Sequence, residues 1–171
     1  MKELNYEFVF AIIAGIWTLI TFFIGRRSEN VKTLREYNND LRNWADTVVD
    51  KMTIAGHICD IDPKKDDRFF DTRQSLLIEL SSLVDKGRFF LPNKGIDEYG
   101  HHKASAYKGF RSEALNHIVA CYNLVKKIDY IDCNKNKELR KDIMDTKRSF
   151  VSAIQDRLDP RKFEREVRKT Y

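Results

Sequence analysis

The sequence predicts an all-α protein, in which an N-terminal transmembrane helix continues into a bundle of about four helices. Three observations predict this class. Residues 8–25 contain no charged side chain, and no proline or glycine interrupts residues 26–55. Through most of the remaining chain, apolar residues recur at the three- and four-residue spacing of a helix with one buried face.

The uncharged run FVFAIIAGIWTLITFFIG, at residues 8–25, has the length of a membrane span. At about 1.5 Å of rise per residue it makes a helix of roughly 27 Å, close to the hydrocarbon thickness of a bilayer. A cleaved secretory signal would end in a small-residue cleavage site, whereas two arginines follow this run. A buried core helix would need an apolar cover that the later sequence does not offer, and an interfacial helix would need a polar face. We therefore expect an anchor at residues 1–27 and one helical domain at residues 28–171.

The charges on either side of the run predict its orientation. Before the run, Lys2 is offset by Glu3 and Glu7. After it come four cations with a single nearby glutamate, Glu29: Arg26, Arg27, Lys32 and Arg35. The positive-inside rule then places the N-terminus outside and the helical domain in the cytoplasm. Three cysteines without a CxxC pair suit the reduced thiols of that compartment.

Small residues are spaced four apart within the run, at Ala11 and Gly15 and again at Ala14 and Thr18. This spacing lets the backbones of neighbouring helices approach closely in a bilayer. It favours a homo-oligomer formed through the span and the helix that follows it. The expected partners are therefore the lipid bilayer and further copies of the chain, with an unidentified protein partner as another candidate.

A stalk helix is expected at residues 28–60, directly after the span. Leu34, Leu41, Val48 and Ala55 fall at successive sevens, the repeat of a coiled coil. Lys51 breaks the second register of that repeat, which favours the first helix of a bundle over a free-standing coiled coil. Both interpretations remain open from the sequence.

Three further helices follow. Asp62 and Pro63 predict the start of the second helix and Gly87 its stop. The third is expected from Phe110, and the fourth from Leu139 to Leu158, before Pro160 and a basic tail that includes Arg161, Lys162, Arg165, Arg168 and Lys169. Between them, Asp132, Asn134 and Asn136 indicate a turn. The expected apolar faces are Phe69, Phe70, Arg73, Leu76, Leu77, Leu80, Leu83 and Val84; Ala114, Leu115, Ile118, Val119, Tyr122, Val125 and Ile128; and Ile143, Met144, Phe150, Val151, Ile154 and Leu158.

Composition and motifs argue against several functional classes. The net charge of +5 is modest, so no sequence-specific nucleic-acid partner is expected. The sequence has none of the common nucleophile, zinc-protease or nucleotide-loop motifs, so we expect no catalytic residues and no cofactor. His57 and Cys59 would point apart on a helix, and His117 with Cys121 supplies too few ligands for a metal ion.

The stretch from residue 86 to residue 111 is the candidate ligand site, because cations and aromatic rings alternate along a long loop. Such a combination suits an anionic, partly planar ligand such as a nucleotide. The residues predicted to bind it are Lys86, Arg88, Asn93, Lys94, His101, Lys103, Tyr107, Lys108 and Arg111. In the competing interpretation, Phe89 and Phe90 plug the end of the bundle and the cations are solvated. In a third interpretation, the stretch is a surface that docks another protein.

Three phrases carry a resemblance: LSSLVDKGRFFLPN at residues 80–93, AYKGFR at residues 106–111 and FVSAIQDRLDPR at residues 150–161. In these phrases the chain resembles a group of uncharacterised bacterial single-span membrane proteins with a cytosolic helical domain. The resemblance implies a bacterial source and therefore an inner-membrane location. It brings no activity and no site residues.

The leading hypothesis is a membrane-anchored, non-enzymatic interaction or regulatory module. The alternative is a nucleotide-gated membrane effector, for example in bacterial antiviral defence, which senses an anionic ligand through the 86–111 loop. A membrane-tethered enzyme is the third hypothesis.

Overall fold

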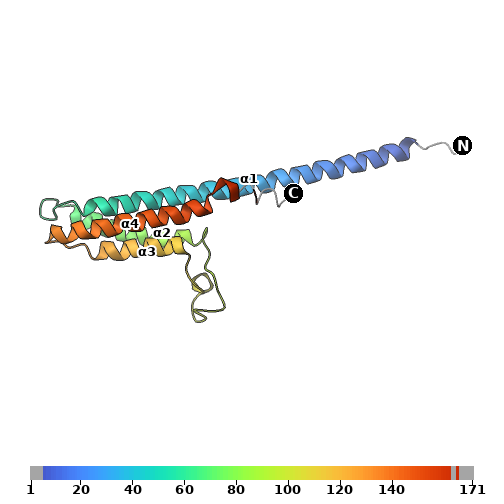
Figure 1. The fold of residues 1–171 in the computed structure, drawn as a ribbon. Coiled ribbons are helices and arrows are strands. Elements are labelled where there is room, and N and C mark those ends of the chain that lie inside the picture. The colour runs from blue at the N-terminus through green and yellow to red at the C-terminus, as the bar shows by residue number, and fades with distance from the viewer. Residues whose placement is uncertain (1–5, 163–164, 166–171) are drawn as a thin grey trace. The chain divides into compact units, whose positions relative to one another are not determined.

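The computed structural model describes residues 6–162 and residue 165, and their regular structure is entirely helical. The α-helices are α1 (Tyr6–Ile58), α2 (Phe69–Gly87), α3 (Glu113–Lys126) and α4 (Cys133–Arg157), and a 3-10 turn, η1 (Ser105–Tyr107), lies in the loop before α3 (Figure 1). The all-α prediction is confirmed. The chain divides into two compact units, Met1–Asp40 with Pro160–Tyr171, and Leu41–Asp159.

The first unit contains the apolar half of α1. This is the one described helix that is long and apolar enough to cross a membrane, with a mean hydropathy of 1.9 over its most apolar stretch, none of which is buried. Its hydroxyl groups are satisfied within the helix: Thr18 Oγ1 donates to Ala14 O at 2.8 Å and Thr21 Oγ1 to Trp17 O at 3.0 Å. Helix α1 runs without interruption from Tyr6 to Ile58, through most of the stretch expected as a stalk helix, residues 28–60.

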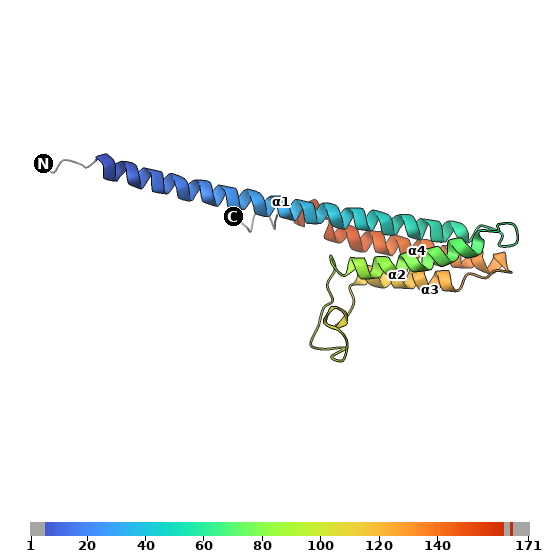
Figure 2. The ribbon, with the colours of Figure 1, turned by 180° about the vertical axis from the view of Figure 1, so that it is seen from behind.

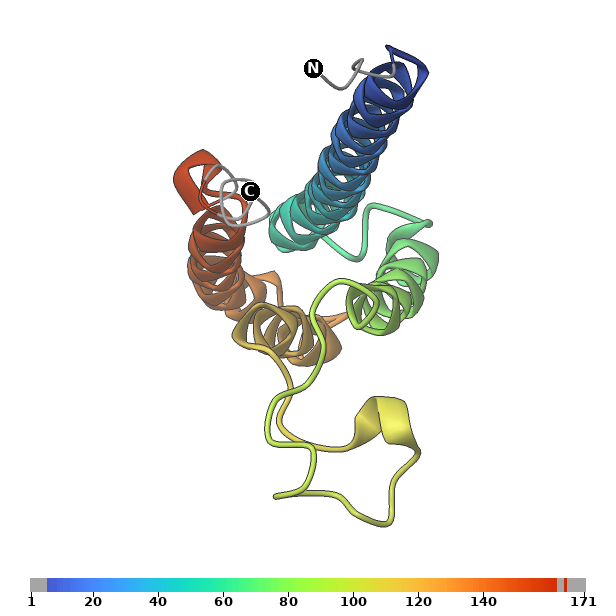
Figure 3. The same ribbon diagram turned by 90° about the vertical axis from the view of Figure 1, so that its right-hand side faces the viewer.

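The second unit has one buried apolar core to which all four helices contribute. Helix α3 contacts both α2 and α4 (Figure 2). Trp44 of α1 lies at the centre: its indole Nε1 donates to Leu83 O of α2 at 3.1 Å, and its ring lies 5.9 Å from that of Phe150 on α4. The loop between α2 and α3 projects to one side of these helices (Figure 3).

The residues at the heptad positions of α1 pack into this core. Leu41 is 3% exposed, and Val48 and Ala55 are fully buried. From residue 41 onward the apolar seam therefore packs against the other helices of the same chain. It is not available for a coiled coil with a second copy, which removes the support for the coiled-coil interpretation in this part of the chain.

The predicted start of the second helix is wrong. Asp62 does not cap α2; its Oδ1 accepts from Lys64 N at 3.1 Å within a separate turn. Asp66 Oδ1 does the same for Arg68 N at 2.9 Å, and α2 begins only at Phe69. These short side chains bind nearby backbone N–H groups in turns, which competes with helix formation.

Gly87 ends α2 as predicted, but without the left-handed backbone that a glycine after a helix usually adopts. The residue after it, Arg88, keeps helical angles (φ −64°, ψ −24°), and Gly87 is not among the positive-φ glycines of the described chain. A Cβ at Gly87 would overlap the Trp44 ring and a methyl group of Leu115. Glycine is needed here because α1 and α3 both approach the end of α2 closely.

The third and fourth helices also differ from expectation at their starts. Helix α3 begins at Glu113, leaving Phe110 in the loop, and α4 begins at Cys133, well before Leu139. Asp132 caps α4 by accepting from Asn134 N at 3.0 Å. Of the predicted basic tail, Arg168 and Lys169 lie outside the described residues.

Two polar residues occupy buried or apolar positions of the helices, where the sequence pattern leads one to expect apolar residues. Asn136, interpreted as part of a turn, is fully buried in α4, where it accepts from Asp129 N and donates to Asp129 O, both at 2.8 Å. Arg73 lies on the apolar face of α2 because its guanidinium caps α3: Nε donates to Val125 O at 3.1 Å and Nη2 to Lys126 O at 2.7 Å.

Candidate functional site

The loop between α2 and α3 is held by contacts within itself. Lys94 and Phe110 form one antiparallel bridge, with N–H···O distances of 2.9 and 2.7 Å. Gly109 (φ +77°) makes the bridge possible, because a Cβ there would overlap the Lys94 carbonyl oxygen. The Phe110 ring stacks on that of Tyr99 with centroids 5.4 Å apart. Lys103 covers Tyr99, its Nζ lying 4.5 Å from the ring centroid.

Four predicted site residues bind one another. The Arg88 guanidinium lies over the Tyr107 ring at 4.4 Å, and its Nη1 donates to Asn93 Oδ1 at 3.2 Å. Asn93 Nδ2 in turn donates to Lys108 O at 2.7 Å. The Arg88 side chain is only 12% exposed and also lies 3.5 Å from Asp85. These groups brace the loop and line a small cavity of about 280 Å³ beside it.

The other predicted residues separate into two groups. Lys86 and His101 are exposed and line none of the cavities described here, and Lys103 is engaged with Tyr99. Lys94 and Arg111 line a larger cavity of about 720 Å³. Of the two phenylalanines expected to plug the end of the helices, Phe90 lies 6.0 Å from the Trp44 ring, whereas Phe89 is 83% exposed.

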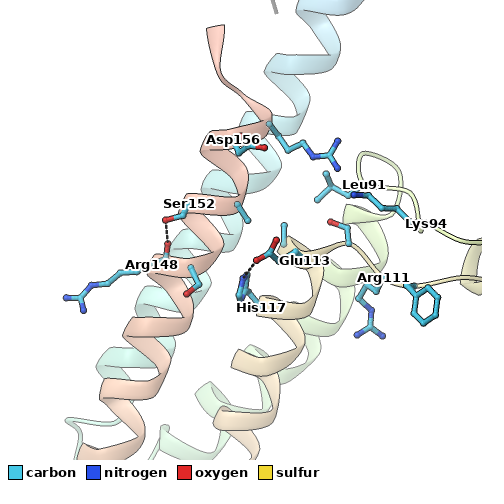
Figure 4. A pocket seen from close by; sticks show the side chains of 14 residues that line it. Leu91, Lys94, Arg111, Glu113, His117, Arg148, Ser152 and Asp156 are labelled. Atoms are coloured by element: carbon cyan, nitrogen blue, oxygen red, sulfur yellow. Dashed lines mark hydrogen bonds and ion pairs between the residues drawn. The ribbon is translucent and has the colours of Figure 1, made fainter. Parts of the chain in front are cut away.

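The larger cavity lies between the loop, the N-terminal end of α3 and the C-terminal half of α4 (Figure 4). Lys94 extends toward it from the loop. Arg148 lines the α4 side, but its guanidinium turns away from the cavity to pair with Asp145 at 2.8 Å. Arg157, in the last turn of α4, is a further cation of the lining.

The N-terminal turn of α3 supplies further polar groups to this cavity. Ser112 occupies the N-cap position and is 8% exposed, yet its side chain makes no capping hydrogen bond. His117 Nε2 lies 3.9 Å from Glu113 Oε1, one turn apart on α3. Arg111 Nη1 donates to Asn116 Oδ1 at 3.4 Å, while its Nε is buried without a hydrogen-bond partner.

Sequence reasoning missed Ser112 and the α4 side of the cavity, and it considered His117 only as a metal ligand. A serine directly before a helical repeat is an N-cap signal and could have drawn attention to Ser112. The α4 residues, such as Arg157, carry no comparable signal, because only the packing of α4 against α3 brings them to the loop.

Cys59 and Cys121 show no sign of activation as nucleophiles. Burial raises the pKa of the Cys121 thiol to about 12, and burial followed by the nearby Asp60 carboxylate raises that of Cys59 to about 11. A reactive cysteine has the opposite shift. Among the described residues, no three His, Cys, Asp or Glu side chains are grouped so that they could hold a metal ion.

The cavity residues come from three separate stretches of the chain, so no short motif could carry them all. In comparisons with protein-family models, curated proteins and solved structures, nothing matches this chain.

Proposed function

We propose that this chain is a single-span bacterial inner-membrane protein whose helical bundle lies in the cytoplasm. There it acts as a non-enzymatic interaction or regulatory module. The observation that carries this proposal is the apolar stretch at the start of α1, no residue of which is buried.

The size of that stretch supports insertion in a bilayer. Ten large apolar side chains between Phe10 and Ile24 are 45–71% exposed. Transferring a side chain of this kind out of water contributes about 1.5–3 kcal/mol, hence roughly 15–30 kcal/mol for ten. Leaving such a surface in water therefore carries a cost of that order relative to burying it. A bilayer removes that cost.

Membrane extraction tests this proposal directly. The full-length chain is expected in the membrane fraction after alkaline carbonate washing and to float with the lipid in a density gradient. Placing lysines at Ile16 and Ile20 costs about 2.5–3.5 kcal/mol each near the centre of a span and should release the protein. Recovery of the unchanged chain in the aqueous fraction without detergent would contradict the proposal.

The orientation rests on the cations that follow the apolar stretch. Arg26 and Arg27 begin a basic segment that favours the cytoplasmic side. A reporter that is active only in the cytoplasm should therefore be active when it is fused after Tyr171. Activity of a periplasmic reporter at the same position would reverse the orientation.

We assign self-association to the span, since the apolar seam of α1 is buried in its own chain from residue 41 onward. A Cβ added at Gly15 would meet no atom within 4 Å, so this face of the helix is open to another helix. Gly15→Leu should lower the cross-linked oligomer fraction in membranes. Gly25→Leu, also in open space, serves as the matched control.

A second candidate is a ligand-gated membrane effector, favoured by the 720 Å³ cavity that Lys94 and Arg111 line. Under this hypothesis, an anionic ligand in the cavity changes how the spans assemble and thereby perturbs the bilayer. Dye leakage from proteoliposomes on addition of a nucleotide would support it. Intact vesicles with every nucleotide tested would exclude it.

A further inference from the structure

We propose that the larger cavity binds a phosphate monoester, with the phosphate seated at the N-terminus of α3 between Ser112 and Lys94. This inference deepens the ligand-gated hypothesis by naming the chemistry of the ligand and the groups that recognise it. It does not depend on insertion in a membrane.

Ser112 is the first reason. A serine at the N-cap normally accepts a hydrogen bond from the first turn of its helix, worth about 1 kcal/mol. Ser112 stands at that position with extended angles (φ −58°, ψ 145°), but its hydroxyl makes no such bond. It is 92% buried and lines the cavity, and no described residue hydrogen-bonds its hydroxyl. The Ser112 hydroxyl is therefore available to exchange hydrogen bonds with a ligand in the cavity.

The first turn of α3 is the second reason. Its leading N–H groups have no partner inside the helix, and the helix dipole adds a partial positive charge at this end. Ser112 does not use its side chain to satisfy these donors. The Ser112 hydroxyl and the first backbone donors of α3 thus lie at the end of the helix that borders the cavity, where an anion would be stabilised.

The third reason is the presence of two cations without a partner in the described chain. In the part of the chain that the structure describes, neither the Lys94 ammonium nor the Arg157 guanidinium has an ion-pair or hydrogen-bond partner, and both residues line the cavity. The bridge between Lys94 and Phe110 fixes the backbone from which the lysine extends. Arg111 adds a third charge at the rim, although its guanidinium is bonded to Asn116.

Two carboxylates also line the cavity, from Glu113 and Asp156. The Glu113 side chain lies 3.9 Å from His117 and is 84% exposed, so water screens its charge. The formal charge of the lining remains positive, since Lys94, Arg111 and Arg157 outnumber the two acids even when the outward-facing Arg148 is left out.

The volume and the lining of the cavity indicate a ligand larger than inorganic phosphate. A volume of about 720 Å³ far exceeds the space that one phosphate needs, and it lies in the range of small-molecule sites. Leu91, Phe110, Ala114 and Ala153 supply an apolar part of the wall. The ligand is thus a phosphate on an organic body, and its source is either a nucleotide or a lipid with a terminal phosphate.

Calorimetric titration of the full-length, detergent-solubilised protein tests the site. Three probes are compared: AMP, adenosine, and dihexanoyl phosphatidic acid below its micellar concentration. AMP or the phosphatidic acid is expected to bind, and adenosine, which lacks the phosphate, is not. Which of the two phosphate monoesters binds more tightly distinguishes the nucleotide from the lipid source.

Substitutions then locate the binding. Ser112→Ala should weaken binding about fivefold and Lys94→Ala about tenfold. Neither should change the melting temperature, because Ser112 makes no capping bond and the Lys94 side chain has no partner in the described chain. Lys108→Ala is the matched control: it lies on the same loop but lines the smaller cavity, and its affinity should equal that of the unchanged protein.

Two results would overturn the proposal. One is the absence of any heat of binding for both phosphate monoesters at millimolar concentration. The other is binding that Ser112→Ala and Lys94→Ala leave unchanged. Because the titration is done in detergent, either failure leaves the membrane-insertion test untouched, and a failed insertion test leaves the titration interpretable.

Discussion

Trp44 donates its buried indole N–H to the carbonyl oxygen of Leu83 at 3.1 Å, which joins α1 to α2 across the core. Trp44→Phe keeps an aromatic ring but leaves this carbonyl without that donor. The free energy of unfolding in urea should fall by about 1–3 kcal/mol. Trp17→Phe, in the exposed apolar stretch, is the control and should leave the unfolding midpoint unchanged.

Gly87→Ala should destabilise the domain, because its new methyl group would overlap Trp44 and Leu115. Overpacking of this kind costs about 1–3 kcal/mol. The measurement is the thermal midpoint in detergent, compared with Gly25→Ala, where the added Cβ meets no atom within 4 Å. Equal midpoints for the two variants would contradict the close packing at the end of α2.

Asn136→Ala should be more costly than its exposed neighbour Asn134→Ala. The Asn136 amide satisfies both the N–H and the C=O of Asp129, each at 2.8 Å. Removing it leaves two backbone groups without those partners, at a cost of about 2–4 kcal/mol. Chemical denaturation of both variants gives the comparison, and a difference below about 0.5 kcal/mol would mean that water replaces the amide fully.

Asp129 gives the domain an acid-sensitive contact. Hydrogen bonds from the backbone N–H of Ile131 and then of Asp132 hold its pKa below the ordinary value of 3.8. A carboxyl whose pKa is lowered on folding contributes stability above pH 4, and that stability is lost as the pH falls through the folded-state value. Asp129→Asn should therefore lose less stability than the unchanged protein between pH 6 and pH 3. Asp67→Asn, at an exposed carboxyl, is the control and should lose as much stability as the unchanged protein. If it loses as little as Asp129→Asn, the acid sensitivity does not come from Asp129.

Thiol labelling should separate the three cysteines. Cys59 and Cys121 are fully buried, and their raised pKa values keep them protonated at pH 8. Cys133 is half-buried at the start of α4. Iodoacetamide should therefore modify Cys133 first in the folded protein and all three in denaturant, as read by peptide mass. Rapid modification of Cys121 under native conditions would show that the core opens readily.

The sequence allowed the number and class of the helices to be predicted, because apolar residues recur along each of them. The element starts were the least predictable part. Asp62 and Asp132 look alike as capping residues, yet Asp62 closes an isolated turn and Asp132 caps α4. Whether a short polar side chain closes a turn or caps a helix depends on the tertiary packing of the residues that follow it.

The candidate site could be predicted only in part. Lys94 and Arg111 were identified from the alternation of cations and rings, and both line the larger cavity. Arg88 and Tyr107 fit the same pattern but stack on each other at 4.4 Å. Cation–π contact inside a loop and recognition of an external ligand require the same residue types, so composition alone could not separate them.

Arg73 reaches from α2 to cap the last carbonyl groups of α3, and 52 residues separate its Nε from its acceptor Val125 O. The cap cannot form until the intervening chain has closed, which carries an entropic cost that local helix formation does not. The last turn of α3 is thus expected to become protected late during refolding, and pulsed hydrogen exchange would record its amides after those of α2.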